Sequence, residues 1–574
     1  MDAVAVSIWV RNEPFINGVL PILPHPRLSV HNIKKLVGYA RGKGKYGFPR
    51  LSYTVWRHIA CNKLQLSEEL AWMFFVTCDM VAENSSEAAE NRLFWNNKFS
   101  SCSTQAEKDQ LKNQAFIGLF HFVLILYIQQ LNKISLRSSL ISGDENPFIY
   151  GWPSASRPRS PASDVGSHDG RLTPTSARNH DEQSHANFVL HNLPEMLELL
   201  VEPDSYALGG IMDQNLSIDA IQALGLIFDA SIDKGRTIRS LCDVALLQQV
   251  QQKSGFSKIS QSFNMRTFIT WIKTNVIQNP FGIASCISQG KRLSWPLGVD
   301  EKESTHRKGR VATNAHLVMR DDSNEGNKLI IMSQVSKQTI ARTSSTLEGA
   351  TVKIHRCHQS FIYLLSSMRT VSIEKCRNTT VVLGAVECAV HVSHCEQVTV
   401  IAACRRITTS HSQICTFHLL TPNRPLVFGG NDTIILAPYN TSYPQLETQM
   451  NSVGLSYTPN YWDVPFCVGP DHHENSPPVW EIMPANDFHS FAIPFVMEGE
   501  LKSPPPVPNK YQKAIKQREK KLEQWQKSIK ETNLSKEHRK QFQSLVETRF
   551  QIWLAESGNK RELDSLATAL ASKK

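Results

Sequence analysis

The sequence lacks most features that mark membrane, secreted or zinc-binding proteins. Its longest apolar run, at 115–128, is shorter than the ~20 residues that cross a bilayer, so we expect no transmembrane segment. The opening stretch, "MDAVAVSIWV", has no basic region of the kind that begins a secretory signal. Twelve cysteines are present, but no two of them form a C-x-x-C pair. We therefore expect free thiols in a reducing cytosol.

Catalytic signatures are missing as well. The stretch "GYARGKGKYG" at 38–47 does not fit the phosphate-loop pattern G-x-x-x-x-G-K-[ST]. Neither G-x-S-x-G nor H-E-x-x-H occurs. The stretch "DHHEN" at 471–475 has metal-binding residue types but no second ligand cluster, which favours a plain loop. These absences predict no enzyme active site, no metal and no cofactor.

Positive charge, by contrast, is concentrated near one end. The chain has a net charge of +10, and 510–549 holds twelve Lys or Arg against five Glu. Such a surface attracts acidic partners: tubulin, nucleic acid or an anionic membrane face. Apolar residues in this region recur at near-heptad spacing, which predicts two amphipathic helices. Two interpretations stay open: a hairpin that packs on the protein's own core, or a docking surface for an acidic or coiled-coil partner. The apolar positions are Tyr511, Ile515, Leu522, Trp525 and Ile529, then Phe542, Leu545, Val546, Phe550, Trp553 and Leu554.

The first half of the chain is predicted to be helical. Apolar residues recur at helical spacing, and Ser67 is a candidate N-cap before two glutamates. A stretch at 142–186 is rich in Ser, Pro, Asp, Gly and His, which predicts a disordered insertion. The helices on its two sides are expected to pack together. The predicted helical segments are 54–66, 67–81, 115–131, 188–201, 217–232 and 263–276.

A repeat follows the helical part. Cys357, Cys376 and Cys395 recur at an interval of nineteen residues, and two apolar positions before each cysteine coincide as well. Units of seventeen to nineteen residues with short alternating strands are too short for a βαβ crossover. They are typical of successive coils of a parallel β-helix, in which equivalent residues form ladders.

The spacing of these cysteines also bears on their chemistry. Zinc ligands converge on one point, whereas one cysteine per coil gives a column with a rise of ~4.8 Å. A small buried ladder residue is therefore the favoured interpretation, with redox-sensitive thiols and a metal site as alternatives. The neighbouring histidines, His355, His358 and His394, are expected to point outward.

Later segments resemble a known domain family. The stretches "VIAACRRITTSH" at 400–411 and "NDTIILAPYNTSYP" at 431–444 are similar to the C-CAP/cofactor C-like domain of tubulin-folding cofactor C and cyclase-associated proteins. The resemblance covers about 313–443 and implies a right-handed parallel β-helix. In catalytic members, a motif of the form A-C-Q-Q-L-R supplies an arginine finger to the GTP of tubulin or a small GTPase.

The chain departs from that motif at the decisive position. Alignment on Ala403 and Cys404 puts Arg405 and Arg406 in place of the glutamines and Thr408 in place of the arginine. Threonine has neither the charge nor the donor fork of arginine, which predicts no catalytic residue. Arg406 shares a strand face with Thr408 but is displaced by about 7 Å. Both arginines are expected in a solvated basic patch that contacts a partner; the alternative is a GTPase-activating protein that uses Arg406.

Segments outside the β-helix, such as "RNEPFINGVL" at 11–20 and "NYWDVP" at 460–465, resemble one member of this family in particular. That likeness implies a non-enzymatic cytoskeletal protein at the centrosome and spindle pole. Such a protein would help position the centrosome and the Golgi apparatus and affect cell shape and migration. Implied partners are centrosomal or microtubule-associated proteins, with tubulin or an Arf-like GTPase as candidates, and no nucleic acid is expected.

The expected architecture is thus multidomain, with both α and β parts. It comprises an α-helical N-terminal domain in two parts (1–141 and 187–299), a disordered insertion (142–186), a linker (300–312), a β-helix (313–447), a Pro-rich extended region packing on the core (448–508) and a basic helical hairpin (509–574).

Overall fold

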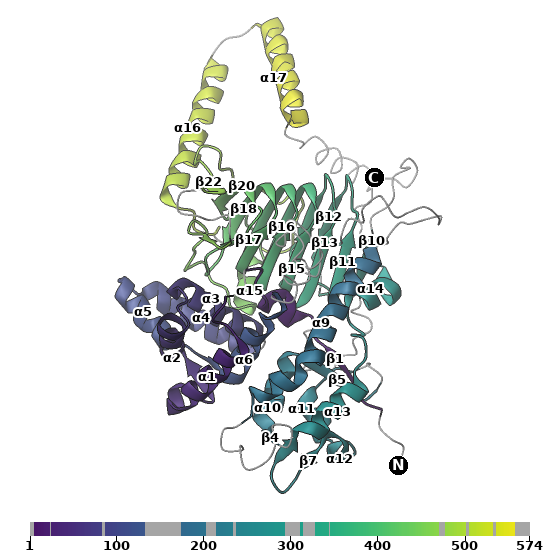
Figure 1. Cartoon of the computed structure of the whole chain (residues 1–574). Coiled ribbons are helices and arrows are strands. Elements are labelled where there is room, and N and C mark those ends of the chain that lie inside the picture. Colours follow the sequence, from purple (N-terminus) through teal and green to yellow (C-terminus); the bar gives the residue numbers. More distant parts are fainter. Residues whose placement is uncertain are drawn as a thin grey trace, which may run out of the picture. The chain divides into compact units, whose positions relative to one another are not determined.

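The computed structural model of the chain falls into two compact units, each described by itself below (Figure 1). Unit 1 consists of Met1–Ala88, Lys98–Lys291 and Ala312–Ile330, and unit 2 of Ala89–Asn97, Arg292–Val311 and Ile331–Lys574. The structure describes residues 5–22, 25–82, 86–132, 174–201, 214–233, 237–292, 310–313, 328–343, 345–469, 477–500, 504–531 and 535–556.

Unit 1 is built around one apolar helix. All residues of α6 (Leu119–Ile128) are buried except His121, which confirms the predicted central helix. Its Tyr127 hydroxyl donates a hydrogen bond to Glu195 of α9, so helices before and after the predicted insertion pack together as expected. The other main helices are α1 (Val30–Arg41), α2 (Tyr53–His58), α3 (Glu68–Ala82), α5 (Gln105–Asn113), α9 (Pro174–Glu198), α10 (Ile218–Ala223), α11 (Leu241–Leu246) and α13 (Met265–Asn275).

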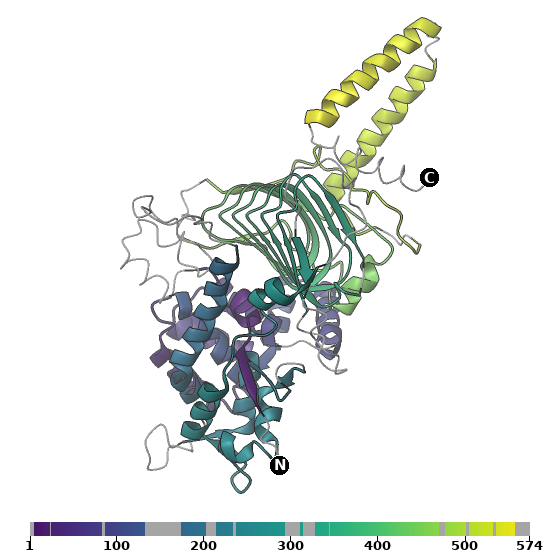
Figure 2. The ribbon, with the colours of Figure 1, turned by 90° about the vertical axis from the view of Figure 1, so that its right-hand side faces the viewer.

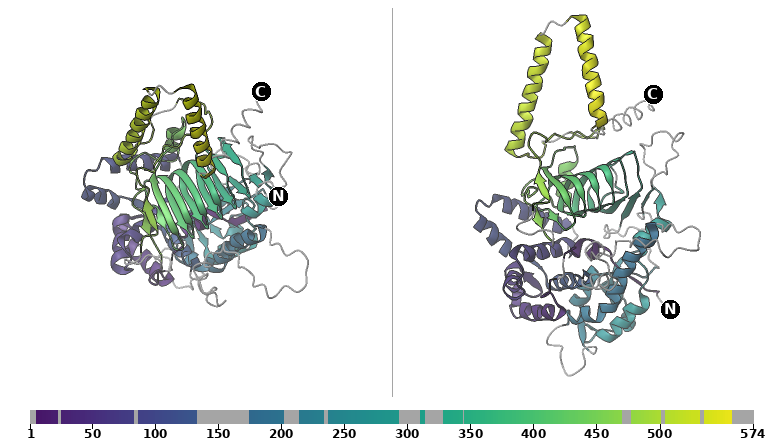
Figure 3. Two further views of the ribbon diagram at one scale, coloured as in Figure 1. Left: turned by 90° about the horizontal axis from the view of Figure 1, so that it is seen from above. Right: turned by 45° about the horizontal axis from the view of Figure 1, so that its top comes forward.

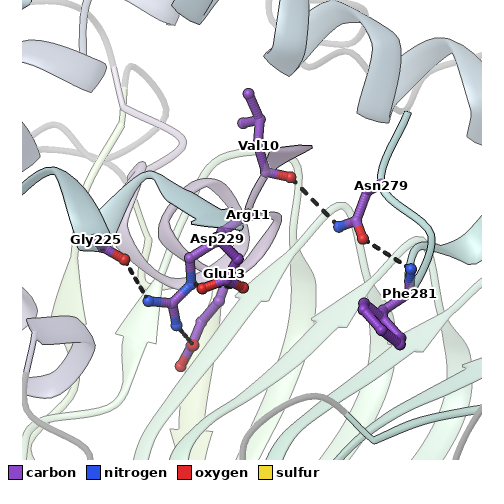
Figure 4. A network of polar contacts seen from close by, with 7 residues as sticks. All are labelled: Val10, Arg11, Glu13, Gly225, Asp229, Asn279 and Phe281. Atoms are coloured by element: carbon purple, nitrogen blue, oxygen red, sulfur yellow. Dashed lines mark hydrogen bonds and ion pairs between the residues drawn. The ribbon is translucent and has the colours of Figure 1, made fainter. Parts of the chain in front are cut away.

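Short strands hold the start of the chain to this helical unit. Strand β1 (Ser7–Val10) pairs antiparallel with β5 (Phe228–Ser231). Arg11, in the "RNEPF" segment, donates a 2.7 Å hydrogen bond to the Gly225 carbonyl and forms ion pairs with Glu13 and Asp229 (Figure 4). The arginine therefore ties the first residues to a segment more than two hundred positions later.

Two sequence predictions for unit 1 are wrong in detail. The region 217–232 was expected to be one helix, but α10 ends at Ala223 and β5 follows. The apolar residues of this region fit the two-residue period of a strand as well as the 3.6-residue period of a helix. Pairing with β1 favours the strand. Helix α9 begins at Pro174, so 174–186 is not a disordered insertion; 142–173 and most of the linker at 300–312 lie outside the described residues.

Unit 2 is a parallel β-helix followed by helices, which confirms the predicted fold class. Its successive coils are stacked on one another (Figure 2). Equivalent positions of these coils lie in register, as in Val352, Val371, Val390 and Ile407. These side chains fill the interior, because every second residue of a strand points inward. The strands are β11 (Leu329–Ser333), β12 (Thr339–Arg342), β13 (Ala350–His355), β14 (Phe361–Leu364), β15 (Met368–Glu374), β16 (Arg377–Ser393), β17 (Glu396–Ser410), β18 (Gln413–Leu420), β19 (Leu426–Val427), β20 (Asp432–Pro438), β21 (Phe466–Cys467) and β22 (Trp480–Ile482).

One face of the β-helix is covered by the chain that follows it. Helix α15 (Leu446–Ser452) and residues 491–497 pack on an outward column that includes Tyr363, Val382 and Ile401. The Gln449 amide donates a 2.9 Å hydrogen bond to the Leu365 carbonyl at a coil corner. At the same corner a side chain on Gly384 would lie 2.3 Å from the Ser366 carbonyl oxygen, so the close approach requires glycine.

Two long helices follow the β-helix at the C-terminal end of the described chain (Figure 3). Helix α16 spans Asn509–Glu531 and α17 spans Lys536–Glu556. Buried residues are confined to Tyr511 and Ala514 in α16 and Leu554 in α17. Of the two interpretations of this region, packing on the protein's own core therefore holds for the start of α16 and fails for most of both helices.

Candidate functional site

The repeated cysteines form a column inside the β-helix. Cys357, Cys376 and Cys395 are at most 2% exposed. The Cys357 amide donates a 3.4 Å hydrogen bond to the Cys376 sulfur, and the thiols of Cys376 and Cys395 donate to carbonyls of the preceding coil. Hydrogen bonding with Cys357 and then Cys395 raises the pKa of Cys376 well above its usual range, so this thiol stays protonated and unreactive.

This placement supports the structural-ladder interpretation over the alternatives. Among the residues that the structure describes, no group of three His, Cys, Asp or Glu side chains could hold a metal ion. The "DHHEN" stretch falls outside the described residues. Of the flanking histidines, His394 is exposed as expected and stacks on His411 with ring centroids 4.9 Å apart. The expectation was wrong for His355, which is 6% exposed.

Beyond Cys395 the column of the cysteines continues with a serine and an asparagine, and the coil that follows Cys395 is shorter than the coils before it. The Cys395 amide donates to the Ser412 hydroxyl, and the Ser412 amide donates to the side chain of Asn431. Only seventeen residues separate Cys395 from Ser412. The register between β16 and β17 shifts twice, so that one residue of β17 faces two of β16 at each shift. At the second shift Arg405 stands opposite Glu387 and Cys388, which places the family motif in the shortened coil.

Thr408, the predicted counterpart of the family's arginine, lies on β17. It aligns with His391 of the preceding coil, and its hydroxyl lies 2.7 Å from His391 Nδ1. Burial, followed by the charge of Arg406, lowers the pKa of His391 to about 3. The imidazole is therefore neutral at physiological pH, and Thr408 and His391 form an uncharged hydrogen-bonded pair.

The two arginines of the motif are not a solvated patch, so that expectation was wrong. Arg406 is 2% exposed and Arg405 is 7% exposed. Burial, together with the charge of Arg405, lowers the pKa of Arg406 to about 10, which still leaves its guanidinium charged at neutral pH. The Arg405 carbonyl accepts hydrogen bonds from the side chains of Thr421 and Asn423. The register puts Arg406 and Thr408 on the same face of β17, opposite Ala389 and His391.

A buried ion-pair cluster beside the motif was not foreseen from the sequence. Glu387, on β16, lies 2.9 Å from Arg369 of the preceding coil and 3.0 Å from Arg92. Arg92 belongs to the part of α4 (Ser86–Ser101) that is assigned to unit 2. The side chains are only 3–13% exposed. The only signal in the sequence was a glutamate and an arginine in the repeat, next to apolar residues, and nothing local in the sequence pointed to Arg92.

The chemistry available at this site is limited. Burial raises the pKa of the Cys404 thiol to about 12, so this cysteine is not an activated nucleophile. Thr408 carries a neutral hydroxyl. The side chains of Arg405 and Arg406 are buried in the same coil as Thr408.

Comparisons with known proteins agree with this geometry. Residues 349–466 match the family profile of tubulin binding cofactor C. Over the whole length, the chain is 41% identical to TBCC domain-containing protein 1 from Homo sapiens, with 100% of this chain and 99% of the relative covered. Identity to the protein of that name is 41% in Danio rerio (99% and 94% covered) and 42% in Bos taurus (100% and 99% covered). Within the described residues, no helix is both long enough and apolar enough to cross a membrane. The chain therefore belongs to the family of TBCC domain-containing protein 1, within the tubulin cofactor C-like proteins.

Proposed function

We propose that this chain is a non-enzymatic cytoskeletal protein that regulates the positions of the centrosome and the Golgi apparatus and thereby affects cell shape and migration. It would act in the cytoplasm, at the centrosome and at spindle poles. Its partners would be centrosomal or microtubule-associated proteins, with tubulin or an Arf-like GTPase as candidates. Membership in the tubulin cofactor C-like proteins supports a cytoskeletal role.

The observation that carries the non-enzymatic assignment is the pair formed by Thr408 and His391. An arginine finger contributes about 10³–10⁵-fold to GTP hydrolysis by stabilising charge on the transferred phosphoryl group. At this position a threonine hydroxyl is engaged with a histidine whose pKa is lowered to about 3, so neither side chain carries positive charge. The β-helix then serves as a binding module.

The alternative, a GTPase activator that uses Arg406, is disfavoured by burial and position. Arg406 lies two residues before Thr408 and is 2% exposed. To reach a γ-phosphate it would have to leave a desolvated site that already lowers its pKa, and it would start about 7 Å away from the family's position.

Single-turnover GTP hydrolysis by tubulin and by an Arf-like GTPase tests this proposal, with the full chain added in excess. We expect the wild type to leave both rates unchanged. Thr408→Arg would restore activation if the β-helix still binds a GTPase. Thr399→Arg is the matched control, because Thr399 is a half-buried threonine of the same strand outside the motif. Circular dichroism of each variant verifies folding.

Activation by the wild type that Arg406→Ala abolishes would overturn the non-enzymatic assignment. The cellular part of the proposal has a separate test. Loss of the protein should displace the centrosome from the nucleus and disperse the Golgi apparatus, and re-expression of the wild type should restore both. Unchanged organelle positions after complete loss would refute that role.

A further inference from the structure

Helices α16 and α17 expose an unusual share of apolar surface. They contain 23 and 21 residues, yet they hold half of the large apolar side chains that are exposed in the described part of the chain. Large exposed apolar patches on soluble proteins commonly mark interaction sites. The exposed residues are Leu522, Trp525, Leu545, Val546, Phe550, Ile552 and Trp553.

The first residues of the apolar stripe of α16 pack against the rest of unit 2. Tyr511 is fully buried against Trp462 and Phe488, with ring centroids 5.9 and 5.0 Å away, and its hydroxyl donates a 2.8 Å hydrogen bond to the Met483 carbonyl. Two turns later, Arg518 donates hydrogen bonds to the Asn486 and Phe488 carbonyls. These contacts fix the first half of the helix to the body of unit 2.

Beyond Arg518 the same stripe is largely exposed in the described structure. Leu522 and Trp525 follow at heptad spacing and are 51% and 49% exposed, and Ile529 is half-buried. A stripe with two apolar positions per heptad is the seam of a coiled coil, into which side chains of a second helix insert. The exposed part of α16 is thus the continuation of an established helix-to-protein interface.

Helix α17 adds a second apolar face next to this seam. The rings of Trp525 and Phe542 lie 6.2 Å apart, so the faces of the two helices meet at this point. Farther along α17, Phe550 and Trp553 stack at 5.9 Å and are about half exposed. Aromatic residues with large exposed area are the usual anchors of protein interfaces.

Charge indicates which kind of occupant fits. Helix α16 carries eight Lys or Arg against three Glu, and α17 carries four against three. A second copy of these helices would therefore be repelled. A membrane surface would accept the charge, but helices that lie on membranes present a broad apolar face rather than a narrow heptad seam. An acidic helix with a complementary seam satisfies both the charge and the spacing.

We propose that α16 and α17 form a docking surface for an acidic, amphipathic helix of another protein. The apolar side of that helix would cover Leu522, Trp525 and the adjoining face of α17. Its flanking acidic residues would pair with basic residues beside the apolar faces of the two helices, such as Lys521, Arg539 and Arg549. This surface does not depend on whether the β-helix binds a GTPase.

Fluorescence anisotropy tests the proposal with the full chain and a labelled synthetic peptide. The peptide consists of heptads with leucine at the core positions and glutamate at the flanking positions. We expect binding that weakens at high salt and at least tenfold less affinity for Leu522→Gln/Trp525→Gln. Ile414→Gln is the matched control, because Ile414 is an equally exposed apolar residue (49%) outside the helices.

A second variant and three further measurements distinguish an acidic helix from other occupants of this surface. Lys521→Glu/Arg539→Glu/Arg549→Glu should abolish binding of the acidic peptide while leaving the apolar faces intact. Equal binding of a peptide with glutamine in place of glutamate would contradict the charge argument. Flotation with phosphatidylserine vesicles but no peptide binding, or a dimer in sedimentation that Leu522→Gln/Trp525→Gln dissociates, would assign the surface to a membrane or a second copy. Binding to none of these would overturn the proposal outright.

Discussion

The coil that carries the family motif and the C-terminal helices differ in which side chains they bury. In the coil, the charged Arg406 is 2% exposed, and three more charged residues form a buried cluster nearby. In α16, the apolar Trp525 is 49% exposed. Charged groups are rarely buried without partners, and large apolar groups are rarely exposed in clusters. The charges of the coil therefore belong to the architecture of the β-helix, and the apolar residues of the helices belong to an interface.

The sharpest test of this comparison is the loss of Glu387. Glu387→Gln leaves Arg369 and Arg92 buried without their carboxylate, and removing one partner of a buried ion pair costs about 3–5 kcal/mol. The free energy of unfolding in urea should fall by that amount. Glu396→Gln is the control, because its ion pair with Arg377 is exposed (68% and 47%) and should contribute at most about 1 kcal/mol. Equal losses in both variants would show that the buried cluster is not structural.

Two histidines of the β-helix predict a dependence of stability on pH. Burial lowers the pKa of His391 to about 3 and that of His418 to about 4, below the ordinary value of 6.5. Below pH 6.5 the unfolded chain therefore binds protons that the folded β-helix does not. The free energy of unfolding should decrease as the pH falls from 6.5 toward 4, by up to about 1.4 kcal/mol per pH unit for each histidine.

His391→Asn should make this decrease shallower, since asparagine can still bond to Thr408 but does not titrate in this range. Urea unfolding at several pH values measures the slope. The exposed His538, on α17, provides the control: His538→Asn should keep the wild-type slope. A slope unaffected by His391→Asn would mean that this imidazole is protonated within the folded protein.

The cysteine ladder should contribute less. Cys376→Ala removes a buried sulfur that makes two hydrogen bonds to the preceding coil, which should cost about 1–2 kcal/mol. Cys102→Ala, at the half-buried end of α4, should change stability by less than about 0.5 kcal/mol. Iodoacetamide labelling followed by mass spectrometry gives a second measure: Cys102 should react in the native protein and Cys376 only after unfolding. Rapid native labelling of Cys376 would contradict the ladder.

The β-helix could be predicted from sequence because its information is local and repeated. Each coil has apolar residues at the same inward positions. The register of Val352, Val371 and Val390 could therefore be seen by aligning the repeats of the sequence with one another. The central helix α6 was equally clear, since nearly all its residues are apolar. Both elements depend on patterns shorter than twenty residues.

The surroundings of the motif could not be predicted in this way. Burial of Arg405 and Arg406 depends on a coil two residues shorter than its predecessor and on packing beyond the repeat. The partner Arg92 comes from a helix almost three hundred residues earlier. The strand β5 was missed for a similar reason, because its partner β1 lies at the other end of the unit's sequence. Long-range pairing leaves no periodic trace in a single sequence.

The smallest expected effect completes the comparison between the coil and the helices. Leu522→Gln/Trp525→Gln should change the free energy of unfolding by less than about 0.5 kcal/mol, because both side chains are half exposed in the folded chain. Tyr511→Ala, in the buried part of the same stripe, should release the helix from Trp462 and Phe488 and cost about 3 kcal/mol or more. Urea unfolding followed by circular dichroism measures both variants. A large loss of unfolding free energy in the Leu522 and Trp525 variant would mean that these residues stabilise the protein's own fold. A loss confined to Tyr511→Ala would place the boundary between the packed part of α16 and its docking surface near Arg518.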